Sequence, residues 1–198
     1  DLHFFPGRNI YSHRPVMKML LDLGTNGNFR TDSDPSFADC LLGMLPGLIE
    51  HKCSRRRRGG FIKRIKEGTY LGHVVEHVFL ELQSAAGIGT DYGKTYTGDG
   101  SVVEIISEYR CREAAQILAQ TAVSAVFSVV TKEPFDIGED ILRAKQLAVK
   151  YLPGPSTLAI LTAAKKRGIP YQILDEGSSL YRLGTGKYQK RIQASISE

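Results

Sequence analysis

Two histidines and a glutamate form an H-x-x-E-H pattern, in which His73, Glu76 and His77 lie within five residues of one another. Residues four positions apart in a helix project from nearly the same face, one turn apart, because each residue turns the helix by about 100°. Two neutral imidazoles arranged in this way can bind Zn²⁺, and a neighbouring carboxylate can activate a metal-bound water as a general base. The pattern therefore predicts a zinc site with His73 and His77 as ligands and Glu76 as the catalytic residue.

The same pattern has a simpler interpretation, in which the three polar residues belong to the solvated face of an amphipathic helix. Apolar residues would then face the core from the other side: Val74, Val75, Val78, Phe79 and Leu82. Two residues weaken this interpretation, because Leu80 falls at about the azimuth of His73 and Gly72 leaves room for another segment to approach. The order of residues is also that of one class of zinc metallopeptidases.

A zinc site needs a third protein ligand. Cys53 is the strongest candidate, because a thiolate is a good zinc ligand and the basic residues around it would stabilise that thiolate. Cys53 could equally be a small buried apolar residue. Three acidic residues are alternative ligands, and the spacing does not choose among them: Glu81, Glu104 and Glu108.

The segment that carries Cys53 is strongly basic. Residues 51–70 hold eight lysines and arginines against one acid, a local net charge of +7, although the whole chain has a net charge of only +5. The remainder is therefore slightly acidic. The core of this segment is the run Arg55, Arg56, Arg57 and Arg58, which precedes Gly59-Gly60 and is followed by Lys63 and Arg64.

The arginine run has two interpretations. A short basic run is usually a flexible, solvated loop. Alternatively, its guanidinium groups bind carboxylates or phosphates in bidentate fashion, beside exposed backbone amides of Gly59-Gly60. Nucleic acid is disfavoured as the partner, because the charge is confined to one patch and no interleaved aromatic residues provide stacking platforms. A carboxylate-rich polymer fits the patch equally well.

Hydrophobic periodicity and turn residues predict an α+β fold, with a helix-rich amino-terminal domain that contains a small β-sheet. Strands are expected at 3–5 and 101–109, separated by a Gly-rich segment at 87–100 that could contain a hairpin. Helices are expected at 15–23, 34–45, 61–66, 70–86, 112–131 and 136–150. Beyond Leu152-Pro153-Gly154-Pro155 we expect a helix at 156–167 and strands at 170–174, 179–184 and 189–195.

These elements divide the chain into a first domain at 1–152 and the opening of a second domain at 153–198. Three cysteines are too few for a disulfide framework, which favours a reducing, cytoplasmic setting. The longest apolar stretch, Ile117–Val130, is interrupted by polar residues and is too short to predict a membrane helix. No phosphate-binding loop, dinucleotide-binding fingerprint or nucleophile elbow is found in the sequence.

An ordered series of motifs resembles the amino-terminal part of the cyanophycin synthetases. The series comprises Gly7–Ser12 with Arg14-Pro15, Leu45–Leu48, Glu50–Ser54, Gly59–Phe61, Glu67–His77, Leu80–Gln83, Gly154–Thr157, Arg167–Pro170 and Arg191–Ser195. The resemblance covers essentially the whole chain. It implies a parent ligase that uses ATP to build a storage polymer with a poly-aspartate backbone and arginine branches.

In this family the amino-terminal domain holds the polymer, and in some members it also carries a metal-dependent site that cuts the polymer into primers. The resemblance places His73, Glu76 and His77 in that site's motif and Cys53 in its Cys-Ser segment. Arg55–Arg58 depart from the family, which usually has a less charged linker there; the added charge would attract the polymer's carboxylates but repel its arginine branches.

The resemblance also implies that the second domain is a truncated ATP-grasp domain and that a Mur-ligase-like domain belongs to the parent enzyme. ATP and Mg²⁺ would be bound only by residues beyond Glu198, so the chain alone is not expected to ligate. We expect zinc as the cofactor, the Asp/Arg polymer and the other domains as partners, and a homo-oligomeric full-length enzyme with no membrane partner.

Overall fold

The structure is a computed structural model that describes residues 1–97, 101–175, 179–193 and 196–197. Its contacts divide the chain into two units, Asp1–Lys145 and Gln146–Glu198. The point of division lies within α5 (Gly138–Tyr151), somewhat before the boundary predicted at Leu152. Both units contain helices and an antiparallel sheet, and the predicted α+β class is confirmed.

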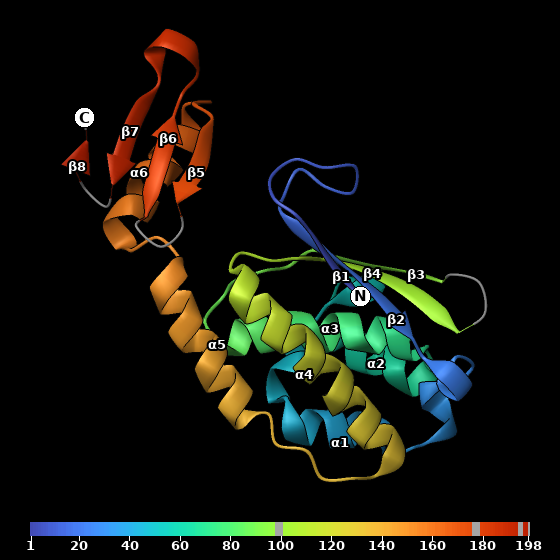
Figure 1. Ribbon diagram of the computed structural model, residues 1–198. Helices are drawn as coiled ribbons and strands as arrows, with labels where there is room; N and C mark the ends of the chain where they lie inside the picture. Colours follow the sequence, from blue (N-terminus) through green and yellow to red (C-terminus); the bar gives the residue numbers. More distant parts are fainter. Residues whose placement is uncertain (98–100, 176–178, 194–195, 198) are drawn as a thin grey trace. The chain divides into compact units, whose positions relative to one another are not determined.

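The sheet of the first unit has four antiparallel strands in the order β1-β2-β4-β3. Their bounds are Leu2–Phe5 for β1, Val16–Asp22 for β2, Gly93–Thr97 for β3 and Val102–Glu108 for β4. The strands β3 and β4 form a hairpin at the end of the Gly-rich segment, with Gly93 opposite Ser107. The sheet therefore brings the middle of the chain, after residue 90, beside the amino terminus (Figure 1).

The helix predicted at 15–23 is wrong, because these residues form β2, a central strand that pairs with β1 on one side and with β4 on the other. Val16, Met17 and Met19 are buried there. Pro15 followed by an apolar run is compatible with a helix start when only neighbouring residues are considered. Backbone hydrogen bonds to two strands distant in sequence decide the outcome instead, which is a tertiary effect on a weak local preference.

The helices of the first unit lie on one side of this sheet. The central one, α3 (Leu71–Ala85), contacts β3 and β4 and also packs against α4 (Arg112–Thr131), so it lies between the sheet and α4 (Figure 1). The shorter helices α1 (Phe37–Met44) and α2 (Gly60–Glu67) complete this layer. Two short 3-10 turns lie between β2 and α1, Gly24–Asn26 (η1) and Thr31–Ser33 (η2). Two more connect α1 to α2, Pro46–Glu50 (η3) and Cys53–Arg55 (η4).

The buried face of α3 is the predicted one, because all five apolar residues expected to face the core are inaccessible to solvent: Val74, Val75, Val78, Phe79 and Leu82. Helix α4 is long and apolar enough, by length and composition alone, to cross a membrane. More than half of its most apolar window is buried within the unit, however, and it packs on α3. These are the properties of the core helix of a globular domain.

The second unit consists of the carboxy-terminal part of α5, the helix α6 (Pro155–Lys166) and a separate antiparallel sheet in the order β5-β6-β7-β8. Its strands are Tyr171–Asp175 (β5), Leu180–Leu183 (β6), Lys190–Gln193 (β7) and Ile196–Ser197 (β8), with a 3-10 turn at Gly186–Tyr188 (η5). A small core of Leu161, Tyr181 and Ile192 joins α6 to the sheet. The helix and three strands predicted here are confirmed, except that 194–195 lie outside the described residues.

Candidate metal centre

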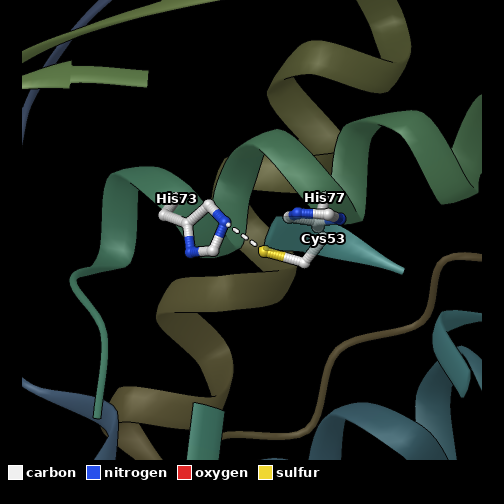
Figure 2. A group of neighbouring side chains, drawn as sticks. All are labelled: Cys53, His73 and His77. Atoms are coloured by element: carbon white, nitrogen blue, oxygen red, sulfur yellow. Dashed lines mark hydrogen bonds between the residues drawn. The ribbon is translucent and has the colours of Figure 1, made fainter. Parts of the chain in front are cut away.

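Helix α3 presents His73 and His77 from adjacent turns, with ring centroids 4.8 Å apart and ring planes nearly perpendicular. The Sγ of Cys53 lies 3.3 Å from Nε2 of His73. One ligand atom from each of Cys53, His73 and His77 lies within 4.8 Å of the other two. Figure 2 shows the sulfur of Cys53 between the two rings. The helical spacing predicted from the H-x-x-E-H pattern is thus realised, and a thiol lies beside both imidazoles.

Cys53 reaches this position through an unusual local backbone. It begins η4 with a positive φ of 47°, which is uncommon for a residue with a side chain. The amide of Phe61 donates to the carbonyl of His51 at 3.1 Å and closes the intervening loop. A side chain at Gly60 would overlap the carbonyl oxygen of Lys52, so the close approach requires glycine there. The loop is therefore folded tightly back onto the start of α2.

Each imidazole has a polar neighbour in addition to the thiol. Nδ1 of His73 lies 3.0 Å from Oγ1 of Thr69, and Nδ1 of His77 lies 2.8 Å from Nδ1 of His51. Phe61 stacks on His77 with ring centroids 4.0 Å apart and an interplanar angle of 22°. These contacts hold the two rings in defined planes.

Burial keeps both imidazoles neutral. Desolvation lowers the pKa of His73 to about 4, with a smaller effect of the Arg64 charge. Desolvation, assisted by His73 and His51, lowers the pKa of His77 to about 2. A neutral imidazole has the free lone pair that a metal requires. The two predicted ligands are therefore in the protonation state suited to coordination at neutral pH.

Glu76 is buried on the same helix, with 6% of its surface exposed. Its Oε2 accepts a hydrogen bond of 2.6 Å from Oγ1 of Thr95 on β3. Gly93, also on β3, leaves the space that the carboxylate occupies, since a Cβ there would lie 2.7 Å from Oε1. Desolvation raises the pKa of Glu76 to about 7, although the Thr95 hydrogen bond acts in the opposite direction. Such a carboxyl group exchanges its proton near neutral pH.

The interpretation of H-x-x-E-H as a solvated face does not agree with this structure. Glu76 and His77 are buried, and so is Leu80, the residue whose position suggested a covered face. Gly72 is approached closely, because a Cβ there would lie 3.0 Å from Val103 and 3.2 Å from Thr95. Strands β3 and β4 therefore cover this part of α3.

The structure also separates the candidates for the third ligand. Glu104 pairs with Lys18 at 3.3 Å, and Glu108 pairs with Arg14 at 2.8 Å. Glu81 contacts Nε2 of His51 at 2.9 Å. Among the described residues, the compact group of ligand atoms contains Cys53 and none of these three acids. Cys53 is therefore the third residue of the cluster.

An open pocket of about 390 Å³ adjoins the cluster. Cys53 and His73 line it, and its other lining residues include Arg64, Tyr70, Thr95 and Val103. Because Thr95 also bonds Glu76, the carboxylate lies directly behind one wall of the pocket. The pocket gives a solute access to the thiol and to one of the two imidazoles.

The basic segment is exposed, but its cations are not equivalent. Arg55 pairs with Glu67, Arg58 pairs with Glu50 at 2.7 Å, and Lys63 also pairs with Glu67 at 3.5 Å. No ion pair involving Arg56 or Arg57 is found within the described part of the chain. Arg64 lines the pocket beside His73. Three of the six cations predicted to form the patch are thus ion-paired, although two of them share the one carboxylate of Glu67.

Sequence reasoning missed three residues that contact the H-x-x-E-H side chains: His51 beside His77, Thr69 beside His73 and Thr95 beside Glu76. His51 stands two positions before Cys53, so a His-x-Cys pattern was available as a signal. Thr69 stands four residues before His73, a spacing that makes two residues neighbours within a helix, but the helix begins only at Leu71, after the N-cap Tyr70. Thr95 comes from another strand, and its proximity to Glu76 has no local signature.

The fold and this cluster define a helix-rich α+β domain that carries a thiol and two neutral imidazoles beside an open pocket. The model of the cyanophycin synthase-like N-terminal domain family matches residues 18–131, and the chain belongs to this family. The match includes every residue of the cluster, both strands that cover it and the basic segment. The resemblance predicted from the ordered motifs is confirmed.

Curated relatives agree with this assignment. The chain is 36% identical over 197 residues to the cyanophycin synthetases of Geminocystis herdmanii and Crocosphaera subtropica, which it matches over 96% of its own length. It is 37% identical over 198 residues to the cyanophycin synthetase of Trichormus variabilis. The chain spans only 22% of the length of these relatives. It therefore matches one part of these longer relatives.

Proposed function

We propose that this chain holds a polymer of aspartate and arginine and hydrolyses it at a metal centre formed by Cys53, His73 and His77. The observation that carries the proposal is the approach of one thiol and two imidazoles to within 4.8 Å of one another. In a parent enzyme of the cyanophycin synthetase type, such cleavage would supply chain ends for a ligase.

The donor set suits zinc. A thiolate and two neutral imidazoles are among the ligands that Zn²⁺ prefers, and three protein ligands leave a fourth position for water or substrate. The adjoining pocket borders Cys53 and His73, so the fourth position would be reachable from solvent. When bound, zinc would acidify a water molecule and polarise a peptide carbonyl.

Glu76 is the proposed general base. Its Oε2 is engaged by Thr95, which leaves Oε1 to take up a proton. A pKa of about 7 is near the optimum for proton transfer at neutral pH. In the hydrolysis, the water oxygen bonds to the amide carbon, the carbon–nitrogen bond breaks, and Glu76 carries a proton from the water to the leaving nitrogen. The second proton of the water passes to the amine as the new carboxyl group ionises, so the products are one carboxylate and one ammonium group.

Binding of the polymer is proposed to use the basic segment. Arg55, Arg58 and Lys63 are held by acids of the chain, so Arg56, Arg57 and Arg64 offer the guanidinium groups with the fewest competing contacts. Arg64 lies in the pocket, where it would orient a carboxylate of the substrate beside His73. The exposed arginines would contact carboxylates further along the polymer.

The wider role follows from the family. We propose that the parent protein is an ATP-dependent ligase, that the second unit opens its ATP-grasp domain, and that nucleotide and Mg²⁺ bind beyond Glu198. A Mur-ligase-like domain, a homo-oligomeric assembly and a cytoplasmic setting belong to the same proposal. The main alternative is a non-catalytic basic module for another polyanion or for nucleic acid. The thiol and two imidazoles gathered beside an open pocket favour the catalytic proposal over it, because a module that only binds anions would not need them.

The test combines zinc content with cleavage of an Asp/Arg polymer by the zinc-loaded chain. We expect about one zinc per chain, and shorter polymer chains that appear with time. Glu76→Gln should retain zinc but lower the cleavage rate by about 100-fold or more, because it removes the general base. Glu104→Gln is the matched control, since Glu104 pairs with Lys18 and lies outside the ligand cluster. A chain that takes up no zinc, or cleavage undiminished in Glu76→Gln, would falsify the proposal.

A further inference from the structure

We propose that Glu81 and His51 act as positioning residues that fix the tautomer of His77, so that its Nε2 keeps a lone pair for the metal. This inference rests on the proposed metal centre and specifies how the chain prepares one of its ligands. It assigns functions to two residues outside the H-x-x-E-H pattern and outside the group of ligand atoms.

The three residues form a continuous chain of contacts. Oε2 of Glu81 lies 2.9 Å from Nε2 of His51, and Nδ1 of His51 lies 2.8 Å from Nδ1 of His77. Both distances are those of good hydrogen bonds. The side chains of His51 and Glu81 are only 15% and 13% exposed, so water competes little for these contacts.

We take His51 as neutral and Glu81 as a carboxylate, and for this pair the direction of each hydrogen bond follows from the donors available. An ionised carboxylate only accepts, so Nε2 of His51 must carry the hydrogen that faces Glu81. The other nitrogen of a neutral His51, Nδ1, then has a lone pair and accepts from Nδ1–H of His77. A neutral His77 that is protonated at Nδ1 has its lone pair at Nε2. The carboxylate therefore determines, through one intervening ring, which nitrogen of His77 can bind a metal.

Gly47 and Phe61 border the contacts between Glu81, His51 and His77 and restrict the positions of these side chains. A side chain at Gly47, in η3, would overlap the carboxylate of Glu81, so a larger residue there would displace the carboxylate from its position beside His51. Phe61 stacks on His77 and keeps its ring in the plane of these contacts. The amide of Phe61 also donates to the carbonyl of His51. One loop thus carries both His51 and Cys53 to α3.

The tautomer is measurable without metal. Long-range proton–nitrogen NMR spectra of the metal-free chain, labelled with ¹⁵N in histidine, distinguish a protonated Nδ1 from a protonated Nε2. We expect His77 to be protonated at Nδ1 in the wild-type chain. In Glu81→Gln, whose amide can donate as well as accept, and in His51→Leu, we expect a mixture of the two tautomers.

Zinc affinity gives the second measurement. Loss of the residue that orients a metal-binding histidine typically weakens metal binding by about 10- to 100-fold. We expect that range for Glu81→Gln and for His51→Leu in competition titrations with a zinc chelator. His51→Asn should recover much of the affinity, because its amide oxygen can still accept from Nδ1 of His77. Glu104→Gln, which removes a partly buried and ion-paired carboxylate elsewhere, should leave both the tautomer and the affinity unchanged.

The outcomes separate this inference from the proposed function. Suppose that the wild-type chain binds zinc, but His77 is protonated at Nε2 or keeps its tautomer in Glu81→Gln and His51→Leu. The positioning role of Glu81 and His51 is then wrong, and the metal centre stands. If the wild-type chain binds no zinc, the metal centre itself fails. Glu81→Gln keeps the shape of the side chain, so it tests the inference even where His51→Leu does not fold.

Discussion

Thr95 donates a hydrogen bond of 2.6 Å to the carboxylate of Glu76, and this contact joins strand β3 to helix α3 at the side of the pocket. The two residues are 19 positions apart, and the hairpin β3–β4 brings them together. A donor to the ionised carboxylate opposes the desolvation that raises the pKa of Glu76. Thr95 therefore keeps this group titrating near neutral pH in spite of its burial.

Substitution of Thr95 by valine should move the pH dependence of polymer cleavage to higher pH. The valine keeps the shape of threonine but removes the hydrogen bond, so the pKa of Glu76 should rise above its value of about 7. The limb of the pH–rate profile that reports ionisation of the base should shift in the alkaline direction, with a lower rate at pH 7. Thr97→Val is the control, because Thr97 lies on the same face of β3 and lines the pocket without bonding Glu76. An unshifted profile in Thr95→Val would remove Glu76 from the role of base.

Substitution of Cys53 by serine should weaken zinc binding by more than about 100-fold, which exceeds the effect expected for residues that only orient a ligand. The hydroxyl is a poor zinc ligand at neutral pH, whereas a thiolate is a strong one. Chelator competition measures the change. Cys40→Ser is the matched control, because Cys40 lies exposed on α1 and does not belong to the cluster. Equal affinities of the two variants would mean that Cys53 does not bind the metal.

Substitution of Gly93 by alanine should destabilise the first unit by about 1–3 kcal/mol, the usual cost of overfilling a packed site. The added Cβ would lie 2.7 Å from Oε1 and 2.8 Å from Cγ of Glu76, so the carboxylate would have to move. Urea unfolding measures the loss. Gly89→Ala tests the specificity of the effect, because a Cβ at Gly89 meets no atom within 4 Å. A Gly93→Ala chain as stable as the wild type would show that Glu76 does not occupy this position.

The metal-free chain should lose stability as the pH falls from about 6.5 to 5. His73 and His77 have lowered pKa values in the folded chain, about 4 and about 2, so only the unfolded chain takes up their two protons in this window. Glu76 acts in the opposite direction, because its raised pKa of about 7 lets the folded chain hold a proton that the unfolded chain has lost. The net difference approaches one proton near pH 5, where the slope is about 1.4 kcal/mol per pH unit, and it is smaller near pH 6.5, where the unfolded histidines are only about half protonated.

Denaturant unfolding at a series of pH values, with a chelator present, measures this slope. His77→Gln removes one of the two histidines that take up a proton only on unfolding. The remaining His73 is then nearly balanced by Glu76, so the stability of this variant should vary little between about pH 5 and 6.5. His3→Gln, at an exposed position of β1, should retain the wild-type slope. A steep slope that persists in His77→Gln would show that His77 is not the source of the pH dependence.

The arrangement of the ligands was predictable from local geometry, whereas their environment was not. The positions of His73 and His77 follow from helical periodicity, and the apolar residues between them mark the buried face of α3. The strand at 16–22 was not predictable in the same way, because its pairing partners lie in β1 and β4. Thr95 lies on a strand of this same sheet. Because the prediction missed β2, it could not place the sheet against α3, and the contact of Thr95 with Glu76 was missed with it.

Ion pairing within the basic segment likewise could not be read from residue types. The sequence presents four equivalent arginines, but the fold places Glu67 beside Arg55 and Glu50 beside Arg58. Both acids lie close by in the sequence, but only the turn through η4 and α2 determines which arginines they reach. The cations available to a partner are therefore fewer than the net charge of the segment indicates.

The difference between the ion-paired arginines and the other two gives a prediction for polymer binding. The double substitution Arg56→Ser and Arg57→Ser should weaken binding of an Asp/Arg polymer by about 3- to 10-fold at low salt, since exposed ion pairs contribute about 0.2–1 kcal/mol each. It should also reduce the salt dependence of binding, because fewer exposed charges are left to be screened. Arg55→Ser and Arg58→Ser should have a smaller effect, because these guanidinium groups already pair with Glu67 and Glu50.

Fluorescence titration of a labelled polymer at several salt concentrations distinguishes the two pairs of substitutions, which change the net charge equally. Arg143→Ser with Lys145→Ser, at exposed positions of α5, controls for the loss of two positive charges far along the chain from the basic segment. If both arginine pairs matter equally, the ion pairs with Glu67 and Glu50 open when the polymer binds, and the whole run acts as one surface. If neither pair matters, the polymer is held at the pocket by Arg64, whose substitution by serine should then abolish binding while the exposed run remains intact.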